Sequence, residues 1–244
     1  MKTIAMIPAR YAATRFRGKL MEMLGNKTII RHTYENTVAT RLFDEVAVVT
    51  DSDIIFNEIV QNGGYAIKSR AHHESGSDRI AEAVEEIDVE IVVNVQGDEP
   101  FVKKSILSSL LEIFEDDHSK KIQVASPMRY LTPNDEITDP NLVKVVVDKE
   151  MNALYFSRSV IPYSRDTKNT ITWYKHIGIY AFRKKALLNF ARWEMTPLEN
   201  AEKLESLRYL ENGVSIKMVI SDEAPVSIDT PADLEKAKAA WKLS

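Results

Sequence analysis

The sequence predicts an α/β fold in a single domain, with a largely parallel sheet covered by helices. Three observations lead to this prediction. The first 95 residues alternate short apolar runs with helical patterns, as β-α-β units do. The runs are apolar on both faces, as in strands that lie between two layers of helices. With 244 residues and 44% hydrophobic content, the chain is long enough for one large core.

The first half of the chain builds outward from an apolar strand that ends at Pro8. The expected elements are a strand at 4–8, a helix at 27–40, a strand at 45–50, a helix capped by Asp51 or Ser52 and running to 61, a strand at 65–68, a helix at 78–86 and a strand at 90–95. Val38 is expected on the buried side of its helix. If the second and third strands lie on one side of the first, the fourth must return to its other side. This topological switch point would open a crevice at the carboxyl ends of the first and fourth strands.

The second half is richer in strands and less regular. The expected elements are a helix at 104–115, strands at 122–126, 142–148, 153–157 and 173–182, a helix at 198–211, a strand at 215–220 and a last helix that begins after Thr230. Thr230 is the predicted N-cap of that helix, with Pro231 at its first position and Asp233 at its third. The segment 165–172 is predicted to be a polar loop.

The loop after the first strand is positively charged, opposite in sign to the net charge of the chain. It holds four basic residues, Arg10, Arg15, Arg17 and Lys19, and no acidic one, although the formal net charge of the chain is -4. A positive loop at the carboxyl end of a parallel strand suits an anion such as a triphosphate, and a solvated basic loop is the alternative. In this loop Gly18-Lys19 is followed by Leu20, and the earlier glycine and the Ser/Thr of a P-loop are missing. Side chains would therefore hold the phosphates.

Two aspartates at strand ends are candidates for a metal site. Asp98 lies in a glycine turn directly after the fourth strand, beside Gln96 and Glu99. Asp229 precedes Thr230, which already caps the last helix, so its carboxylate is not needed there. Each could be an ordinary turn residue. Together they suffice for Mg²⁺, which keeps several waters and takes one or two carboxylates plus substrate phosphates.

Two further groups of polar residues have both a functional and a structural interpretation. Ser75 and Gly76 could use a hydroxyl and amides to contact a base or phosphate at a helix start, or could simply cap that helix. Glu199, Glu202 and Glu205 recur every third residue, which predicts a solvated helix face. The chain contains no Gly-x-Ser-x-Gly elbow and no His-Glu-x-x-His motif, so covalent hydrolase and zinc protease chemistry lack support.

Composition narrows the class of partner and the compartment. The chain has no cysteine, which excludes a disulfide framework and thiolate metal sites, and no apolar run near 18 residues. Its basic residues form no broad patch of the kind that duplex nucleic acid requires. We therefore expect a soluble, cytoplasmic protein with a small anionic ligand, without nucleic acid or membrane insertion.

Several segments, taken in order, resemble a known family. They are IPARYAATRFRGK, HHESGSDRI, VNVQGDEP, ALYFSRSVIPY, KHIGIYAFRK, PLENAEKLESLR and SIDTPADLEKA. They are similar to successive motifs of the 3-deoxy-manno-octulosonate (Kdo) cytidylyltransferases, also called CMP-Kdo synthetases, over almost the whole chain. ALYFSR and VQGDEP are specific to that family, whereas the opening loop is shared more widely among sugar-activating nucleotidyltransferases.

The resemblance implies a fold, a reaction and a set of site residues. The fold would be a single-domain, Rossmann-like mixed, mostly parallel sheet of the nucleotide-diphospho-sugar transferase type, in a homodimer. Residues 1–126 would mainly bind nucleotide, and 127–230 would bind sugar and form the dimer. CTP and Mg²⁺ would be used to make CMP-Kdo or CMP-8-amino-Kdo for lipopolysaccharide biosynthesis. The implied CTP-binding residues are Ala9, Arg10, Arg15, Lys19, Ser75, Gly76 and Gln96; the sugar-binding residues are Gln96, Arg158, Arg165, His176, Tyr180 and Glu205; Asp98 and Asp229 would bind the metal and, with Lys19, act in catalysis.

Two departures from the family pattern and three rival functions complete the prediction. Arg17 replaces the proline of a usual Pro-Gly-Lys, and Ser206 stands where a glutamine is common, in the sugar pocket. The nearest rival function activates another acidic sugar, such as a sialic acid. A catalytically silent nucleotide-binding regulator and a metal-dependent glycosyltransferase are the others. Intact Lys19, Asp98 and Asp229 count against the regulator, and the lack of Asp-x-Asp after the fourth strand counts against the glycosyltransferase.

Overall fold

The computed structural model describes residues 1–12, 16–70, 73, 75–132, 135–165, 171–223 and 227–241. The chain forms two compact units: a first unit of Met1–Leu107 with Pro225–Ser244, and a second unit of Ser108–Ala224. Both units combine strands with helices, and parallel and antiparallel pairings both occur among the described strands. The predicted α/β class with a mixed sheet is therefore confirmed.

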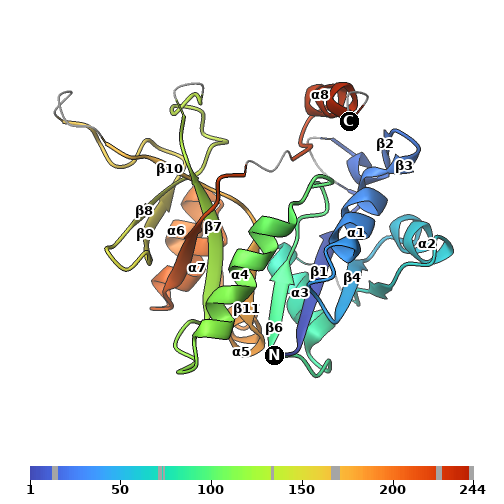
Figure 1. Ribbon diagram of the computed structural model, residues 1–244, viewed down its shortest axis with the longest axis horizontal. Helices are drawn as coiled ribbons and strands as arrows, with labels where there is room; N and C mark the ends of the chain where they lie inside the picture. Colours follow the sequence, from blue (N-terminus) through green and yellow to red (C-terminus); the bar gives the residue numbers. More distant parts are fainter. Residues whose placement is uncertain are drawn as a thin grey trace. The chain divides into compact units, whose positions relative to one another are not determined.

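The first unit is built on four parallel strands (Figure 1). They are β1 (Thr3–Ala9), β4 (Glu45–Thr50), β5 (Ala66–Lys68) and β6 (Ile91–Asn94), in the order β5-β4-β1-β6. β1 is buried along almost its whole length and pairs with β4 on one side and β6 on the other. The predicted switch point is thus confirmed. It places the residues that follow β1 and β6 at the same edge of the sheet.

Side-chain caps begin the helices of the first unit. The helices are α1 (Ile29–Ala39), α2 (Asp53–Gln61), α3 (Gly76–Val84) and α8 (Pro231–Trp241). Thr28, Ser52 and Ser75 each accept a hydrogen bond from the backbone amide three residues ahead. At α8, Thr230 Oγ1 accepts from the Asp233 amide and donates to the Asp233 carboxylate, as the sequence predicted. α4 (Lys104–Asp116) carries the chain into the second unit.

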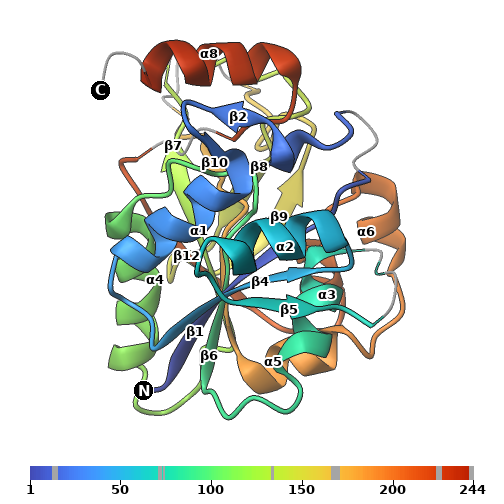
Figure 2. The ribbon, with the colours of Figure 1, turned by 90° about the vertical axis from the view of Figure 1, so that its right-hand side faces the viewer.

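Two expectations for the segment around α1 were wrong. The helix begins at Ile29 instead of residue 27 because Lys27 and Thr28 form β3, which pairs with β2 (Met23–Leu24) after the short 3-10 helix Lys19–Met21. Val38, expected in the core, is 44% exposed, whereas Ile29, Ile30 and Thr33 are buried. α8 lies beside β2 (Figure 2). The Trp241 ring at its end packs on His32, with ring centroids 4.6 Å apart.

The second unit is a mostly antiparallel arrangement centred on β7 (Val124–Tyr130). Its other strands are β8 (Lys144–Val147), β9 (Ala153–Ser157), β10 (Tyr174–His176), β11 (Tyr180–Arg183) and β12 (Ile216–Ile220), and its short helices are α5 (Lys184–Phe190), α6 (Pro197–Glu202) and α7 (Ser206–Glu211). β10 and β11 pair antiparallel with β7, and β12 pairs parallel with it. The predicted strand at 173–182 is therefore two strands, interrupted at 177–179.

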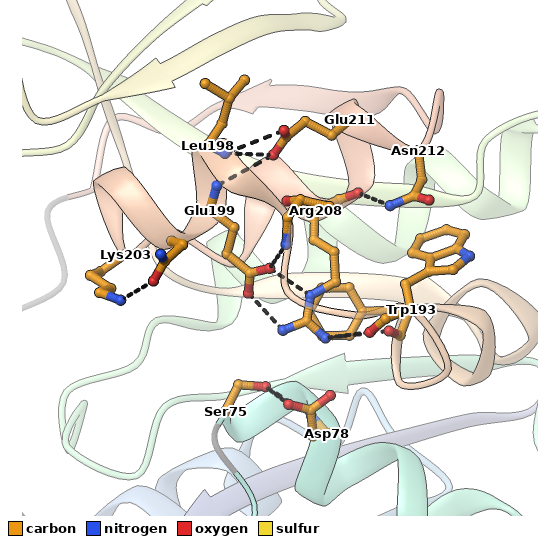
Figure 3. A network of polar contacts seen from close by, with 12 residues as sticks. Ser75, Asp78, Trp193, Leu198, Glu199, Lys203, Arg208, Glu211 and Asn212 are labelled. Carbon is orange, nitrogen blue, oxygen red and sulfur yellow. Dashed lines mark hydrogen bonds and ion pairs between the residues drawn. The ribbon is translucent and has the colours of Figure 1, made fainter.

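The helix predicted at 198–211 is likewise two helices. Lys203 adopts a left-handed conformation with φ of 54°, which ends α6 before α7 begins. The break turns Glu199 and Arg208 toward each other, and two hydrogen bonds of 2.6 and 2.7 Å join the buried pair (Figure 3). Arg208 also stacks on the Phe190 ring, 4.0 Å from its centroid. The expected solvated face was wrong for Glu199, which is 3% exposed.

Candidate active site

Lys19, Asp98 and Asp229 meet in the first unit, as the sequence predicted. Lys19 Nζ lies 2.5 Å from Asp98 Oδ2 and 3.0 Å from Asp229 Oδ1. The Lys19 and Asp98 side chains are 14% and 20% exposed, and that of Asp229 is 46% exposed. One ammonium group therefore bridges two carboxylates, and Asp229 is 210 residues from Lys19 in sequence. Solvent still reaches the place where they meet.

Backbone contacts explain how these side chains come together. Gly18, in a left-handed conformation with φ of 72°, turns the basic loop into the 3-10 helix that starts at Lys19. After β6, a Cβ on Gly97 would lie 3.1 Å from the Pro8 carbonyl oxygen, so this turn packs closely against the end of β1. The Ile228 amide donates to the Asp98 carbonyl oxygen at 3.0 Å. That bond places Asp229 beside Asp98 just before the α8 cap.

The charges of this cluster favour a cation between the two aspartates. Burial would lower the pKa of Lys19, but Asp98 and Asp229 outweigh it and hold the pKa above its ordinary value. Lys19 is thus an ammonium ion, and the cluster keeps one net negative charge. No group of three or more His, Cys, Asp or Glu side chains that could hold a metal occurs within the described ranges. Two carboxylates with phosphates and waters as further ligands match the needs of Mg²⁺.

The other predicted nucleotide residues surround the ends of β1 and β6 in the same unit. Ala9 is the buried last residue of β1, and Arg10 after it is exposed. A side chain on Gly76 would come within 3.2 Å of Pro8, so the start of α3 lies against the end of β1. Gln96 Nε2 donates to Asn94 Oδ1 at 3.3 Å. Arg15 lies outside the described residues.

Ser75 uses its hydroxyl within the protein. It accepts from the Asp78 amide at 3.1 Å and donates to Asp78 Oδ2 at 2.6 Å (Figure 3). The structural interpretation of Ser75, a helix cap, is therefore confirmed. A contact of Ser75 or Gly76 with a nucleotide stays a prediction.

The predicted sugar residues belong to the second unit, where three of them are neighbours. The His176 and Tyr180 rings have centroids 5.3 Å apart, and both side chains are 8% exposed. Burial raises the pKa of the Tyr180 phenol, and the charge of Glu205, which lies immediately before α7, raises it further. The structure thus brings His176, Tyr180 and Glu205 together.

His176 is a neutral ring in a defined tautomer. Burial, with a smaller effect of Lys175, lowers its pKa to about 3. Ser126 Oγ lies 2.8 Å from His176 Nε2 and 2.7 Å from the Ile179 carbonyl oxygen. A hydroxyl has one proton, which the carbonyl must receive, so Nε2 carries the imidazole proton and donates to Ser126. Nδ1 is then an acceptor.

The two predicted arginines differ in how they are held. Arg158 is half-buried after β9, and its Nε and Nη1 donate to the carbonyl oxygens of Glu202 (2.7 Å) and Pro140 (2.9 Å). Arg165 is exposed and is the last residue described before 171. Glu202, Lys144 and Asn94 contact predicted site residues but were not predicted as functional. Of these, only Lys144 could have been found from the sequence, as a single charge in the apolar run 142–147.

A family model described as cytidylyltransferase matches residues 4–216. A 3-deoxy-manno-octulosonate cytidylyltransferase of Flavobacterium johnsoniae is 61% identical over 239 residues, covering 98% of both chains. The protein of that name from Thermodesulfovibrio yellowstonii is 42% identical over 252 residues, covering 98% of this chain and 97% of its own. No helix in the described ranges is both long and apolar enough to cross a bilayer.

Solved structures are also similar to this chain. A CMP:2-keto-3-deoxy-manno-octonic acid synthetase complexed with CTP has a TM-score of 0.93 and 36% identity, covering 100% of this chain and 99% of its own. A 4-diphosphocytidyl-2C-methyl-D-erythritol synthase of Anaerococcus prevotii, at 16% identity and a TM-score of 0.63, shares the fold. These similarities favour Kdo activation over the sialic acid and regulator alternatives. The chain is a nucleotidyltransferase that belongs to the 3-deoxy-manno-octulosonate cytidylyltransferase family.

Proposed function

We propose that this chain couples CTP to a Kdo-type sugar acid and releases pyrophosphate, with Lys19, Asp98 and Asp229 as its reaction centre. The observation that carries this proposal is the single ammonium ion bound between two carboxylates at the carboxyl ends of β1 and β6. Ligands of open α/β sheets bind at such a switch point. The names of the relatives support CTP and Kdo as the substrates.

The reaction is an in-line displacement at the α-phosphorus of CTP. The anomeric 2-hydroxyl oxygen of the sugar forms the new P–O bond, the bond between the α-phosphorus and pyrophosphate breaks, and the hydroxyl proton passes to solvent water. Both reactants are anions, so their repulsion must be offset within the site. Lys19 and the loop arginines Arg10, Arg15 and Arg17 supply four positive charges for the triphosphate and for the charge that develops on pyrophosphate.

Asp98 and Asp229 are the proposed ligands of a magnesium ion. Their carboxylates already converge on one cation, Lys19 Nζ, so the donor set suits a divalent ion once Lys19 turns to the phosphates. Bound there, Mg²⁺ would lower the pKa of the sugar hydroxyl and neutralise charge on the α-phosphate. Asp98 is fixed by the Gly97 turn, and the Asp229 amide donates to Asp233 at 3.3 Å.

The sugar acid is assigned to residues of the second unit together with Gln96. Arg158 and Arg165 would pair with the sugar carboxylate, since a guanidinium can donate two parallel hydrogen bonds to it. Gln96, His176, Tyr180 and Glu205 would contact hydroxyl groups. The neutral His176 ring suits this role because its Nδ1 can accept from a hydroxyl without adding charge.

The proposal extends to assembly and location. We propose a cytoplasmic homodimer whose product supplies activated Kdo for lipopolysaccharide biosynthesis. Light scattering coupled to size-exclusion chromatography tests the dimer, and a monomer mass would contradict it.

The test of function is CTP-dependent release of pyrophosphate with Mg²⁺. Kdo, 8-amino-Kdo and a sialic acid are supplied side by side, and we expect turnover with an octulosonate and none with the sialic acid. Asp98→Asn and Asp229→Asn should each lower turnover by at least about 100-fold, the effect typical of lost electrostatic stabilisation. Asp88→Asn is the matched control because Asp88 forms an exposed ion pair with Lys2 in the same unit, at 3.0 Å. Near-normal turnover of Asp98→Asn or Asp229→Asn would refute the assigned centre.

A further inference from the structure

Four hydrogen bonds hold Arg158, and none of the groups that make them was predicted to belong to the site. The Arg158 amide donates to Glu202 Oε2 at 2.9 Å, and its Nε donates to the Glu202 carbonyl oxygen at 2.7 Å. Its own carbonyl oxygen accepts from Lys144 Nζ at 2.6 Å. Its Nη1 donates to the Pro140 carbonyl oxygen at 2.9 Å. Both the main chain and the guanidinium of Arg158 are therefore fixed.

Lys144 links the same two parts of the chain that the Arg158 guanidinium links, namely residues 139–140 and residue 158 itself. It lies in β8 with no exposed surface, and its Nζ donates to the Asp139 carbonyl oxygen at 3.1 Å as well as to that of Arg158. The carbonyl oxygen of the next residue, Pro140, accepts the hydrogen bond from Arg158 Nη1. Burial lowers the pKa of Lys144, so its ammonium is held there at a cost in free energy. The carbonyl groups that it binds explain why a lysine stands in an apolar strand.

Glu202 holds Arg158 without neutralising its guanidinium. The Glu202 carboxylate accepts from Ser157 Oγ at 2.6 Å and from the Arg158 amide, so it is occupied by neutral donors. The guanidinium instead donates to two uncharged carbonyl groups. Within the described ranges, no hydrogen bond or ion pair engages its Nη2. A fixed guanidinium that forms no ion pair with the described residues, and whose Nη2 bonds to none of them, is suited to a carboxylate.

We propose that Glu202 and Lys144 are positioning residues that hold the Arg158 guanidinium in place for the carboxylate of the sugar acid. The inference rests on the proposed function, which assigns that carboxylate to Arg158. An unrestrained arginine would lose rotamer freedom on binding, and fixing the side chain beforehand removes that cost from the binding step. Neither Glu202 nor Lys144 needs to touch the substrate.

Steady-state kinetics of four variants test the inference. Glu202→Gln leaves one amide oxygen to accept from both Ser157 and Arg158, and should raise the KM for Kdo by about tenfold, the range expected when one long side chain loses its preorganisation. Lys144→Met should act in the same direction, and Arg158→Ala should raise that KM at least as much. In all three, the KM for CTP should stay within about twofold of that of the parent, because preorganisation of Arg158 concerns the sugar alone.

Glu211→Gln is the matched control. Glu211 accepts from the Leu198 and Glu199 amides at 3.1 to 3.3 Å, so this change also weakens a carboxylate contact with α6. It should leave the KM for Kdo unchanged. If Glu202→Gln raises that KM no more than Glu211→Gln does, the inference is overturned. If Lys144→Met does not fold, the comparison of Glu202→Gln with Glu211→Gln tests the inference without it.

A substrate analogue separates positioning from general damage. The parent should bind Kdo far more tightly than an analogue in which a primary amide replaces the carboxylate, with the affinity for the analogue measured as an inhibition constant. That preference should shrink in Glu202→Gln as it does in Arg158→Ala, whereas a merely structural defect would weaken both ligands alike. An unchanged preference in Glu202→Gln with a reduced one in Arg158→Ala overturns the inference and leaves the proposed function standing. No pyrophosphate release by the parent with Kdo or 8-amino-Kdo would overturn the proposed function first, and the inference with it.

Discussion

The buried neutral ring of His176 makes a quantitative prediction about stability at low pH. Its pKa is about 3 in the folded chain, because of burial, and 6.5 is the ordinary value expected on unfolding. Between these values the unfolded chain binds a proton that the folded chain does not. Stability must therefore fall as the pH falls from about 6.5 toward about 3.

The size of the effect follows from the two pKa values. A pKa that differs by one between the folded and the unfolded chain corresponds to about 1.4 kcal/mol of stability. Lowering the pH from 7.5 to 4.5 protonates His176 almost fully in the unfolded chain and hardly at all in the folded one. This ring alone should therefore lower the free energy of unfolding by about 2.7 kcal/mol. That is a large share of the roughly 5–15 kcal/mol by which native proteins are stable.

Urea unfolding of the parent and of His176→Gln at several pH values measures this contribution. Glutamine does not titrate, and its amide can replace His176 Nε2 as the donor to Ser126. Between pH 7.5 and 4.5 the free energy of unfolding should fall by about 2.7 kcal/mol less in the variant than in the parent. His118→Gln, at a position outside the core, controls for the loss of a histidine as such. Parallel profiles for the parent and His176→Gln would refute the burial of a neutral ring.

Two further substitutions test the packing described above. Gly25→Ala should cost more than about 1 kcal/mol of stability, because Gly25 has φ of 65° and an added Cβ would lie 2.7 Å from Trp241 Nε1. Gly213→Ala, with φ of 73° and nothing within 4 Å of the added atom, should cost less in the same thermal unfolding assay, and equal costs would contradict the Trp241 contact. Arg208→Met should lower the free energy of unfolding by about 3–5 kcal/mol, because it leaves the Glu199 carboxylate buried and unpaired. Adding Glu199→Gln should restore part of that loss, and no recovery would contradict the pairing.

Local patterns predicted the first unit well. The strand at 45–50 and the caps Ser52 and Thr230 were found as predicted, because they depend on side chains within a few residues of one another. Asp229 was found by the same reasoning, since Thr230 already serves as the cap. The approach of the Lys19 loop to Asp98 followed from the strand order, which parallel crossovers restrict to few possibilities. That Asp229 joins them was a separate hypothesis, based on the two carboxylates that a magnesium site can use.

Long-range contacts limited the prediction of the second unit. The threefold spacing of Glu199 and Glu202 resembled a solvated face, but a left-handed Lys203 breaks the helix and buries Glu199 against Arg208. No glycine marks that break. The burial of His176 depends on the packing of β10 against its neighbours, which no local pattern reveals. Lys144 was not predicted either, although a lone lysine in an apolar strand is a signal that could have revealed it.

Diffraction at the manganese absorption edge, from crystals grown with CTP and Mn²⁺, would test the central assignment most directly. Mn²⁺ reports the position of the magnesium ion that we propose. We predict an anomalous peak in contact with both Asp98 and Asp229, with Lys19 Nζ moved from the two carboxylates to the phosphates. A peak bound by phosphates alone, with Lys19 still bridging both aspartates, would contradict the account.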